Sequence, residues 1–324
     1  MMVNLNRLQG IEFKAMGTDV VVMGREDGIQ TYWGVPVIQW FEAIEHIASR
    51  FQSDSELSKF NIAPTNKQVK LSYHLYSMIR SAWTWSMKTD GLFQPFIGSE
   101  LSRLGYNCSF EKIGTPDQEE VQVAERRDGH TVNSEYSQAL ILEDHSRTAI
   151  RSIPSQLDLG GMGKGWSVDC AASMLRNSFH VSKGLIDAGG DIKVWSDDEP
   201  WVLGVQSPFH EEDEWLQLYV KKAAVATSNI LYRRWEYQGK TSHHHILNGK
   251  SGKPAETDIV QATVLATSVE EAEVAAKVIC MVGSEMLSDW MRTHFPHLGY
   301  IAITQSGSIK INRNVYEFAE RVIT

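Results

Sequence analysis

The sequence predicts an α+β fold, with a mostly antiparallel sheet and packed helices, in a single large domain over residues 1–324. Three observations support this prediction. Short strand-like segments dominate the second half of the chain, several other segments keep helical spacing of apolar residues, and neither a proline- or serine-rich linker nor an internal repeat divides the chain. A chain of 324 residues is long enough to bury a full core.

The first half is predicted to hold one interrupted strand, three helices and a hairpin. N-cap and first-turn residues at 53–56 start the second helix, and Thr89-Asp90-Gly91 ends the third. The polar segment 106–132 shows no clear period and is expected on the surface. The expected elements are a strand over 11–24 broken at Met16-Gly17-Thr18, helices over 35–51, 53–60 and 71–87, and a hairpin of 139–142 with 148–153.

The second half is predicted to be rich in strands. A short strand ends at Leu157-Asp158-Leu159, and a glycine run leads from it into a helix. Thr267-Ser268 is expected to begin another helix, and one more helix lies near the end of the chain. The expected helices cover 165–179 and 269–281, and the expected strands cover 184–186, 191–195, 201–205, 215–220, 231–237, 259–266, 300–304 and 309–312.

Composition excludes several classes of function. The formal net charge of −9 argues against nucleic-acid binding, which needs a basic face. No apolar run has the length of a signal peptide or a membrane span, so we expect a cytoplasmic protein that does not insert into membranes. The three cysteines are far apart, without metal-ligand spacing, and are expected to be reduced.

The segment from Leu157 to Gly165 contains a glycine run before a helix. It is not a P-loop, because Asp158 stands where the motif needs glycine and Gly165 stands where it needs Ser or Thr. Glycines before a helix still let the backbone approach a phosphate. A lysine in the first turn, here Lys164, is unfavourable against the helix dipole unless an anion lies nearby. The residues leave two alternatives open: an anion site, or a tight turn with a solvated lysine.

Two further motifs have ordinary structural explanations. Asp187 to Asp191 contains a glycine pair between two strand segments, as a tight or bulged hairpin turn would. The adjacent residues His243, His244 and His245 would point to alternate faces of a strand, so at most two share a side. Taken alone, they favour an exposed histidine cluster over a catalytic base.

Together, the motifs from about Phe13 to Gly283 resemble the FAD:protein FMN transferase family, the ApbE-type flavin transferases. The matching motifs occur in the family's order and at roughly its spacing. They are Ala15 to Thr18, Asp54 to Asn61, Asp90 to Pro95, Leu157 to Asp169, Asp187 to Asp191, Ala226 to Ser228, His244 to Asn248 and Ala272 to Lys277.

The resemblance implies a tunnelling-fold-like domain that binds FAD. It also implies transfer of the FMN half of FAD to a Thr or Ser hydroxyl of an acceptor protein carrying a flavinylation motif, with release of AMP. His245 matches the family's proposed general base, and Lys164 lies at the phosphates. The implied FAD-binding residues are Met16, Phe51, Phe93, Gln94, Pro95, Asp158, Lys164 and Ile246.

The implied magnesium site departs most from the family pattern. Where the family reads Ala-Asp-Ala-x-Ala-Thr, this chain reads Ala272 to Lys277, with Glu273 and Lys277 at the ligand positions. A glutamate can bind Mg²⁺, but an ammonium group has no lone pair. At i and i+4 the two side chains could form an ion pair. We therefore hold two hypotheses: Mg²⁺ binds through Glu273, the Gly161 carbonyl and waters, or the Lys277 ammonium replaces the ion.

Other departures keep alternative functions open. Gln94 replaces the aspartate of Phe-Asp-Pro, and Leu247-Asn248-Gly249 replaces Ile-Asp-Pro. The alternatives are FAD hydrolysis to FMN and AMP without protein transfer, and FAD binding without turnover.

Overall fold

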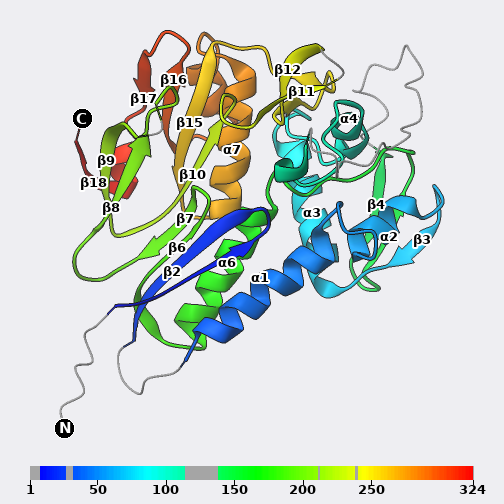
Figure 1. Cartoon of the computed structure of the whole chain (residues 1–324), viewed down its shortest axis with the longest axis horizontal. Helices are drawn as coiled ribbons and strands as arrows, with labels where there is room; N and C mark the ends of the chain where they lie inside the picture. The colour runs from blue at the N-terminus through cyan, green and yellow to red at the C-terminus, as the bar shows by residue number, and fades with distance from the viewer. Residues whose placement is uncertain (1–7, 27–31, 114–137, 211, 238–239, 324) are drawn as a thin grey trace. The chain divides into compact units, whose positions relative to one another are not determined.

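The computed structural model describes residues 8–26, 32–113, 138–210, 212–237 and 240–323 (Figure 1). The chain forms two compact units: unit 1, comprising Met1–Ala43, Met162–Asn229 and Thr257–Thr324, and unit 2, comprising Ile44–Gly161 and Ile230–Glu256. Each unit is built from separate stretches of sequence. The single-domain organisation stays a prediction.

Unit 1 is built on an eight-stranded antiparallel sheet in the order β1-β2-β6-β7-β10-β15-β16-β17. Its strands are β1 (Gln9–Ala15), β2 (Thr18–Glu26), β6 (Val181–Ala188), β7 (Asp191–Trp195), β10 (Lys222–Asn229), β15 (Ile259–Ala266), β16 (Gly299–Thr304) and β17 (Ile309–Ile311). The interruption expected within one strand at 16–18 is the turn of a hairpin, with Met16 at a φ of +54°. Both central residues of this turn have positive φ, which matches the twist of the flanking strands.

A second, three-stranded antiparallel sheet packs against this one. It has the order β18-β9-β8, from β18 (Ala319–Ile323), β9 (Glu214–Val220) and β8 (Trp201–Gln206). Alternate residues of β10, Ala223 and Val225, share a buried apolar cluster with Leu216 and Leu218 of β9. The core between the two sheets therefore follows the two-residue period of a strand.

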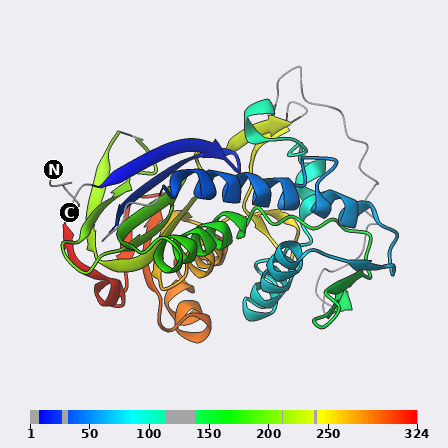
Figure 2. The same ribbon diagram turned by 90° about the horizontal axis from the view of Figure 1, so that it is seen from below.

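Helices cover the other side of the large sheet. Helix α7 (Val269–Val282) packs on β10 and β15, and α6 (Gly163–Asn177) packs on β6 and on α7; Figure 2 shows α6 and α7 on one face of the sheet. Every residue of β15 is buried because both faces of the strand are covered. Unit 1 also contains α8 (Leu287–His294) and α9 (Val315–Phe318), while α1 (Gly34–Ala48) contributes residues to both units.

Unit 2 contains one long helix, α3 (Tyr73–Lys88), with several short helices and small antiparallel sheets. The short helices are α2 (Glu56–Ile62), α4 (Gly98–Arg103) and the 3-10 helix η1 (Phe110–Lys112). The strands are β3 (Gln68–Lys70), β5 (Thr148–Arg151) and β4 (Leu140–Glu143) in one sheet, β11 (Arg234–Tyr237) with β12 (Lys240–His244), and β13 (Leu247–Asn248) with β14 (Lys253–Pro254).

Two buried polar side chains hold the loop that follows β5. Arg151 donates hydrogen bonds to the carbonyls of Asn61, Ala63 and Ile153. The amide of Asn61 bonds both the N–H (2.8 Å) and the carbonyl (2.9 Å) of Leu157. The predicted strand at 157–159 is wrong: Leu157 bonds a side chain on α2 and the Asp158 N–H bonds the Pro95 carbonyl, and neither residue pairs with a strand.

Other predictions have clear outcomes. The hairpin of β4 and β5 is confirmed, as are the helices that begin after the N-caps Ser55 and Ser268. The strand β10 was not predicted. Residues 114–132 of the surface segment expected at 106–132 lie outside the described part. No helix in the described ranges is long and apolar enough to cross a membrane.

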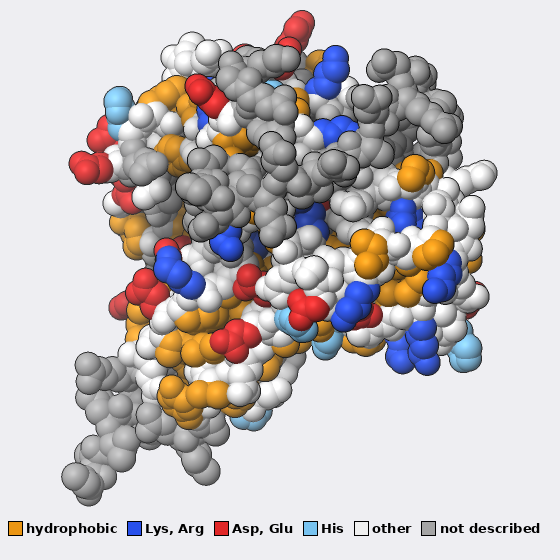
Figure 3. Space-filling model, turned by 45° about the vertical axis from the view of Figure 1, so that its right-hand side comes forward, with side chains coloured by type: hydrophobic (Ala, Val, Ile, Leu, Met, Phe, Trp, Pro, Cys, Tyr) orange, Lys and Arg blue, Asp and Glu red, His pale blue; other side chains and the backbone are white. Residues whose placement is uncertain are grey.

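The face drawn in Figure 3 carries both acidic and basic side chains.

Candidate functional site

A buried cluster of charged side chains lies in unit 1, at the start of α6. We call Lys164, Asp191, Glu273 and Lys277 the lysine–carboxylate cluster. The Lys164 ammonium donates to Asp191 and, at 2.9 Å, to Oε1 of Glu273. The side chains of Asp191 and Glu273 are 3% and 1% exposed. Lys164 therefore has its anions, but they are carboxylates of the protein itself.

Glu273 is the centre of this cluster. Its Oε1 also accepts from Lys277, one helical turn further along α7, at 3.0 Å, and its Oε2 accepts from the Gly165 N–H at 2.8 Å. Burial alone would raise the pKa of Glu273. The two ammonium groups and the Gly165 N–H outweigh burial and lower this pKa to about 2. Glu273 is ionised at neutral pH.

Burial also affects the pKa values of Asp191 and Lys164. Burial and the neighbouring Glu273 carboxylate raise the pKa of Asp191 to about 6, against the opposing pull of Lys164. Burial would lower the pKa of Lys164, but the two carboxylates raise it above its usual value. Lys164 is therefore a fixed cation at the beginning of α6.

Glycines at two places, the β6–β7 turn and the start of α6, make the cluster possible. Gly189 and Gly190 have φ values of +68° and +88° in the β6–β7 turn, where the Asp187 carboxylate accepts from the Gly190 N–H at 2.8 Å. The hairpin turn expected at Asp187 to Asp191 is thus confirmed, and it places Asp191 at the start of β7. At Gly165, a Cβ atom would lie 2.7 Å from the backbone nitrogen of Glu270. Only glycine lets α6 approach α7 this closely.

The cluster does not have the donor set of a divalent-cation site. Both oxygens of Glu273 already accept hydrogen bonds, two of them from cations. The described residues contain no group of three or more His, Cys, Asp or Glu side chains that could hold a metal ion. Gly161 belongs to unit 2 and Glu273 to unit 1. The ion pair of Glu273 with Lys277, one of the two arrangements expected, is present.

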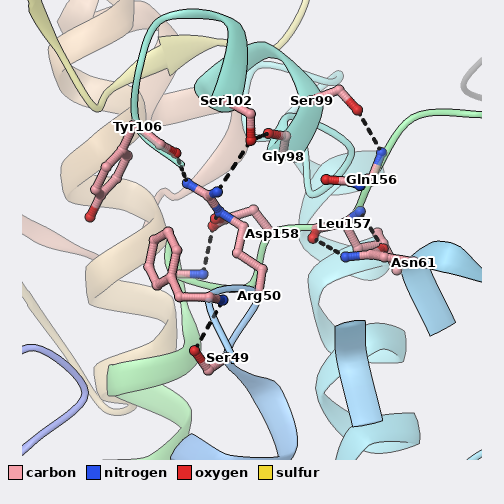
Figure 4. A network of polar contacts seen from close by, with 12 residues as sticks. Ser49, Arg50, Asn61, Gly98, Ser99, Ser102, Tyr106, Gln156, Leu157 and Asp158 are labelled. Atoms are coloured by element: carbon pink, nitrogen blue, oxygen red, sulfur yellow. Dashed lines mark hydrogen bonds and ion pairs between the residues drawn. The ribbon is translucent and has the colours of Figure 1, made fainter. Parts of the chain in front are cut away.

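Unit 2 holds a second buried ion pair, between Arg50 and Asp158 (Figure 4). Arg50 also donates to the Tyr106 carbonyl at 2.6 Å and to Ser102 at 3.4 Å, and Asp158 accepts from the Gly160 N–H at 2.8 Å. The two side chains are 6% and 11% exposed. Asp158 was predicted as a site residue. Arg50 was not, although it directly precedes the predicted Phe51.

Aromatic rings surround this ion pair. Phe51, 39% exposed, lies 5.6 Å from the Tyr106 ring, and Tyr106 lies 5.3 Å from Trp235. The Arg50 guanidinium stands over the Phe51 ring at 4.3 Å. Such a group of aromatic side chains with one exposed member can pack against a planar ring. Sequence analysis identified Phe51 but missed Tyr106 and Trp235, which come from distant segments.

Residues 93–95 follow α3 and are largely buried. The Phe93 N–H bonds the Thr89 hydroxyl at 3.1 Å, and the Gln94 side-chain oxygen accepts from the Phe96 N–H at 3.2 Å. The Pro95 carbonyl accepts from the Asp158 N–H at 2.7 Å. The structure thus brings two of the predicted binding segments, 93–95 and Asp158, together.

The three histidines occupy different environments at the end of β12. His244 is buried, and its Nε2 lies 3.0 Å from the Ala255 carbonyl. Burial lowers the pKa of His244, so its neutral ring donates to that carbonyl. The ring of His243 lies 6.3 Å from Trp235 instead, so these neighbours alternate as expected. His245 follows the strand and is half-buried.

The predicted residues divide between the two units. Met16, Lys164 and Glu273 lie in unit 1; Phe51, Phe93, Gln94, Pro95, Asp158, Gly161, His245 and Ile246 lie in unit 2. The side chain of Ile246 is 1% exposed, and its carbonyl accepts from the Ala255 N–H. Asp191, to which the sequence analysis gave no role in the site, is the additional member of the lysine–carboxylate cluster.

Comparisons with known proteins identify the family of this chain. The model of the ApbE family matches residues 16–302. The "FAD:protein FMN transferase" of Klebsiella pneumoniae is 26% identical over 253 residues, which cover 77% of this chain and 75% of the relative. A protein of the same name from Chlamydia pneumoniae is 26% identical over 262 residues, 78% of each chain.

Solved structures agree over nearly the whole chain. The ApbE protein of Thermotoga maritima has a TM-score of 0.81 and 25% identity, covering 97% of this chain and all of that one. The apo flavinyl transferase ApbE of Pseudomonas stutzeri has a TM-score of 0.80 at 18% identity, covering 99% of both chains, and shows the fold alone. The predicted α+β fold class is confirmed.

Proposed function

This chain belongs to the ApbE family, and we propose that it transfers the FMN half of FAD to a Thr or Ser hydroxyl of an acceptor protein, releasing AMP. The observation that carries the proposal is the family match over residues 16–302, together with relatives that are named FAD:protein FMN transferase. FAD is thus a substrate whose pyrophosphate is cleaved.

Lys164 and the beginning of α6 suit the phosphates of FAD. A helix N-terminus presents free N–H groups, and the glycine run before it lets backbone approach an anion. Lys164 has three N–H donors, of which Asp191 and Glu273 take two within the described residues. We assign the third to a phosphate oxygen.

The aromatic group of unit 2 suits the planar rings of FAD. Phe51 is exposed beside the buried Arg50–Asp158 pair, and Pro95 is bonded to Asp158. Met16, Phe93, Gln94 and Ile246 complete the proposed binding residues. The rigid ion pair would fix the position of Phe51, which reduces the entropy lost on binding.

The reaction needs a group that accepts the proton of the attacking hydroxyl. It also needs a positive charge that stabilises the negative charge on the phosphates. The acceptor oxygen attacks the phosphorus of the FMN half, the bond from that phosphorus to the bridging oxygen breaks, and AMP leaves with that oxygen. We assign the proton of the attacking hydroxyl to His245, because a neutral imidazole nitrogen can accept a proton as a general base and this ring is half-buried. Lys164 offsets charge on the phosphates.

The acceptor is a protein that carries a flavinylation motif, and the expected location is the cytoplasm. Water in place of the hydroxyl group would give FMN and AMP instead, and FAD bound without cleavage would make the chain a binding module. The same assay distinguishes the three functions.

Incubation with FAD and an acceptor protein tests the proposal. Mass spectrometry of the acceptor is expected to show the mass gain of FMN, with one AMP released per adduct. His245→Ala should slow both by roughly 100-fold or more. His145→Ala, at an exposed turn between β4 and β5, is the matched control and should leave both unchanged. AMP without adduct indicates hydrolysis, and bound FAD with neither product refutes the enzyme.

A further inference from the structure

The hydrogen bonds of Glu273 use most of its capacity as an acceptor. An ionised carboxylate has about four lone-pair positions. Lys164 and Lys277 both donate to Oε1, and Gly165 donates to Oε2. A magnesium ion bound to Oε1 would need to lie about 2.0–2.1 Å from that oxygen. It would then share one oxygen with two ammonium groups, which repel it.

The charges of the lysine–carboxylate cluster already balance. Lys164 and Lys277 carry two positive charges, and Asp191 and Glu273 carry two negative charges when ionised. All four side chains are 15% exposed or less. In the chain without FAD, a divalent cation would add two uncompensated charges to a buried site, where charge without a partner is expensive.

Lys277 is held where it is by local structure. Glu273 and Lys277 are one turn apart on α7, so they meet on one face of the helix. The ammonium is 12% exposed and lies 3.0 Å from Oε1. Releasing Lys277 to admit a metal ion would break a buried ion pair, which costs far more than breaking an exposed one.

We propose that the Lys277 ammonium takes the place of a divalent cation beside Glu273, so that this chain binds no divalent metal there and cleaves FAD without one. The metal-free cleavage rests on the proposed function, whereas the exclusion of metal concerns the cluster alone. Lys277 is a positioning residue that fixes Glu273 and, through it, Lys164.

Manganese, followed by electron paramagnetic resonance, tests the exclusion without any turnover. We would titrate Mn²⁺ into the full chain with FAD bound, using FAD alone as the blank. The wild-type chain is expected to bind no Mn²⁺ beyond the blank. Lys277→Thr removes one ammonium and provides a hydroxyl oxygen, and should gain about one Mn²⁺ per chain. Lys222→Thr, which removes a lysine from an exposed ion pair, is the matched control and should behave as the wild type.

AMP release in EDTA and in Mg²⁺ gives the second measurement, on the wild-type chain with an acceptor. Equal rates support the proposal. Stoichiometric Mn²⁺ binding by the wild type, or AMP release lost in EDTA and restored by Mg²⁺, overturns it. A folded Lys277→Thr chain that binds no more Mn²⁺ than the wild type also overturns it. If no AMP forms in either buffer, the proposed function fails, and the wild-type Mn²⁺ titration still decides whether the cluster excludes metal.

Discussion

The two buried charged groups of this protein, the lysine–carboxylate cluster of unit 1 and the Arg50–Asp158 pair of unit 2, use charge differently. In unit 1, ammonium and carboxylate groups come from α6, β7 and α7, and they bond mainly one another. In unit 2, one guanidinium bonds one carboxylate and also a backbone carbonyl and a hydroxyl.

The two arrangements should differ in how strongly the substitution of one charged side chain lowers stability. The cluster depends on Glu273, because removing that one side chain separates both lysines from a shared oxygen. Arg50 has further acceptors, and its planar group lies over two aromatic rings. If Asp158 is substituted, Arg50 still bonds the Tyr106 carbonyl and the Ser102 hydroxyl. The stability of unit 2 should therefore be less sensitive to loss of one charge in its ion pair.

Among the substitutions that test this comparison, Glu273→Ala should lower the free energy of unfolding the most. It leaves the buried Lys277 ammonium without the carboxylate that it contacts, and we expect a loss of about 4 kcal/mol in the free energy of unfolding. Urea denaturation followed by circular dichroism measures it. Asp289→Ala is the control, since Asp289 pairs with Arg292 at an exposed position and should cost at most about 1 kcal/mol. Equal losses would show that the cluster is not the sensitive point.

Asp191 should make the stability of the fold decrease as the pH rises from about 4 to about 6. Its pKa is raised to about 6 in the folded chain, so between the unfolded value of 3.8 and about pH 6 the folded state binds more protons than the unfolded state. The contribution of Asp191 is therefore present below about pH 4 and is lost as the pH rises through 6, by about 3 kcal/mol. Asp191→Asn should remove this loss in denaturation curves measured from pH 4 to 7. An unchanged profile would assign the pH dependence to another group.

Asp158→Asn should have a smaller effect, about 2 kcal/mol, because Arg50 keeps its bond to the Tyr106 carbonyl. The same denaturation measurement applies. Asp289→Asn, in an exposed pair with Arg292, is the control and should produce no measurable change. A loss as large as that of Glu273→Ala would remove the distinction between the two regions.

Arg50→Lys is expected to have the smallest effect, about 1 kcal/mol. Lysine keeps the charge but cannot reach Asp158 and the Tyr106 carbonyl with one rigid group. Under the proposed function, FAD affinity measured by flavin fluorescence should fall with it, because the planar guanidinium no longer lies over the Phe51 ring. Unchanged affinity together with unchanged stability would show that the guanidinium geometry is not needed.

The sequence by itself determined the elements whose signals are local. Ser55 and Ser268 begin helices because each hydroxyl accepts a backbone N–H three residues on, and β15 has the predicted bounds because its apolar run is bordered by polar residues. The Glu273–Lys277 pair is equally local, since four residues make one turn of helix. Resemblance to a family, rather than periodicity, identified Phe51 and Asp158, whereas the position of Lys164 in the first turn of a helix already indicated an anion nearby.

Only the tertiary structure decided which charges meet. Lys164 reaches Asp191 and Glu273, which lie 27 and 109 residues further along the chain, and Arg50 reaches Asp158 over 108 residues. The strand β10 was also missed, because its alanines carry little strand preference and gain their place from neighbouring strands on both sides. Helix caps and helical turns are fixed by residues a few positions apart. Buried ion pairs depend on sheet register and on how closely two helices approach, and no short segment of sequence contains that information.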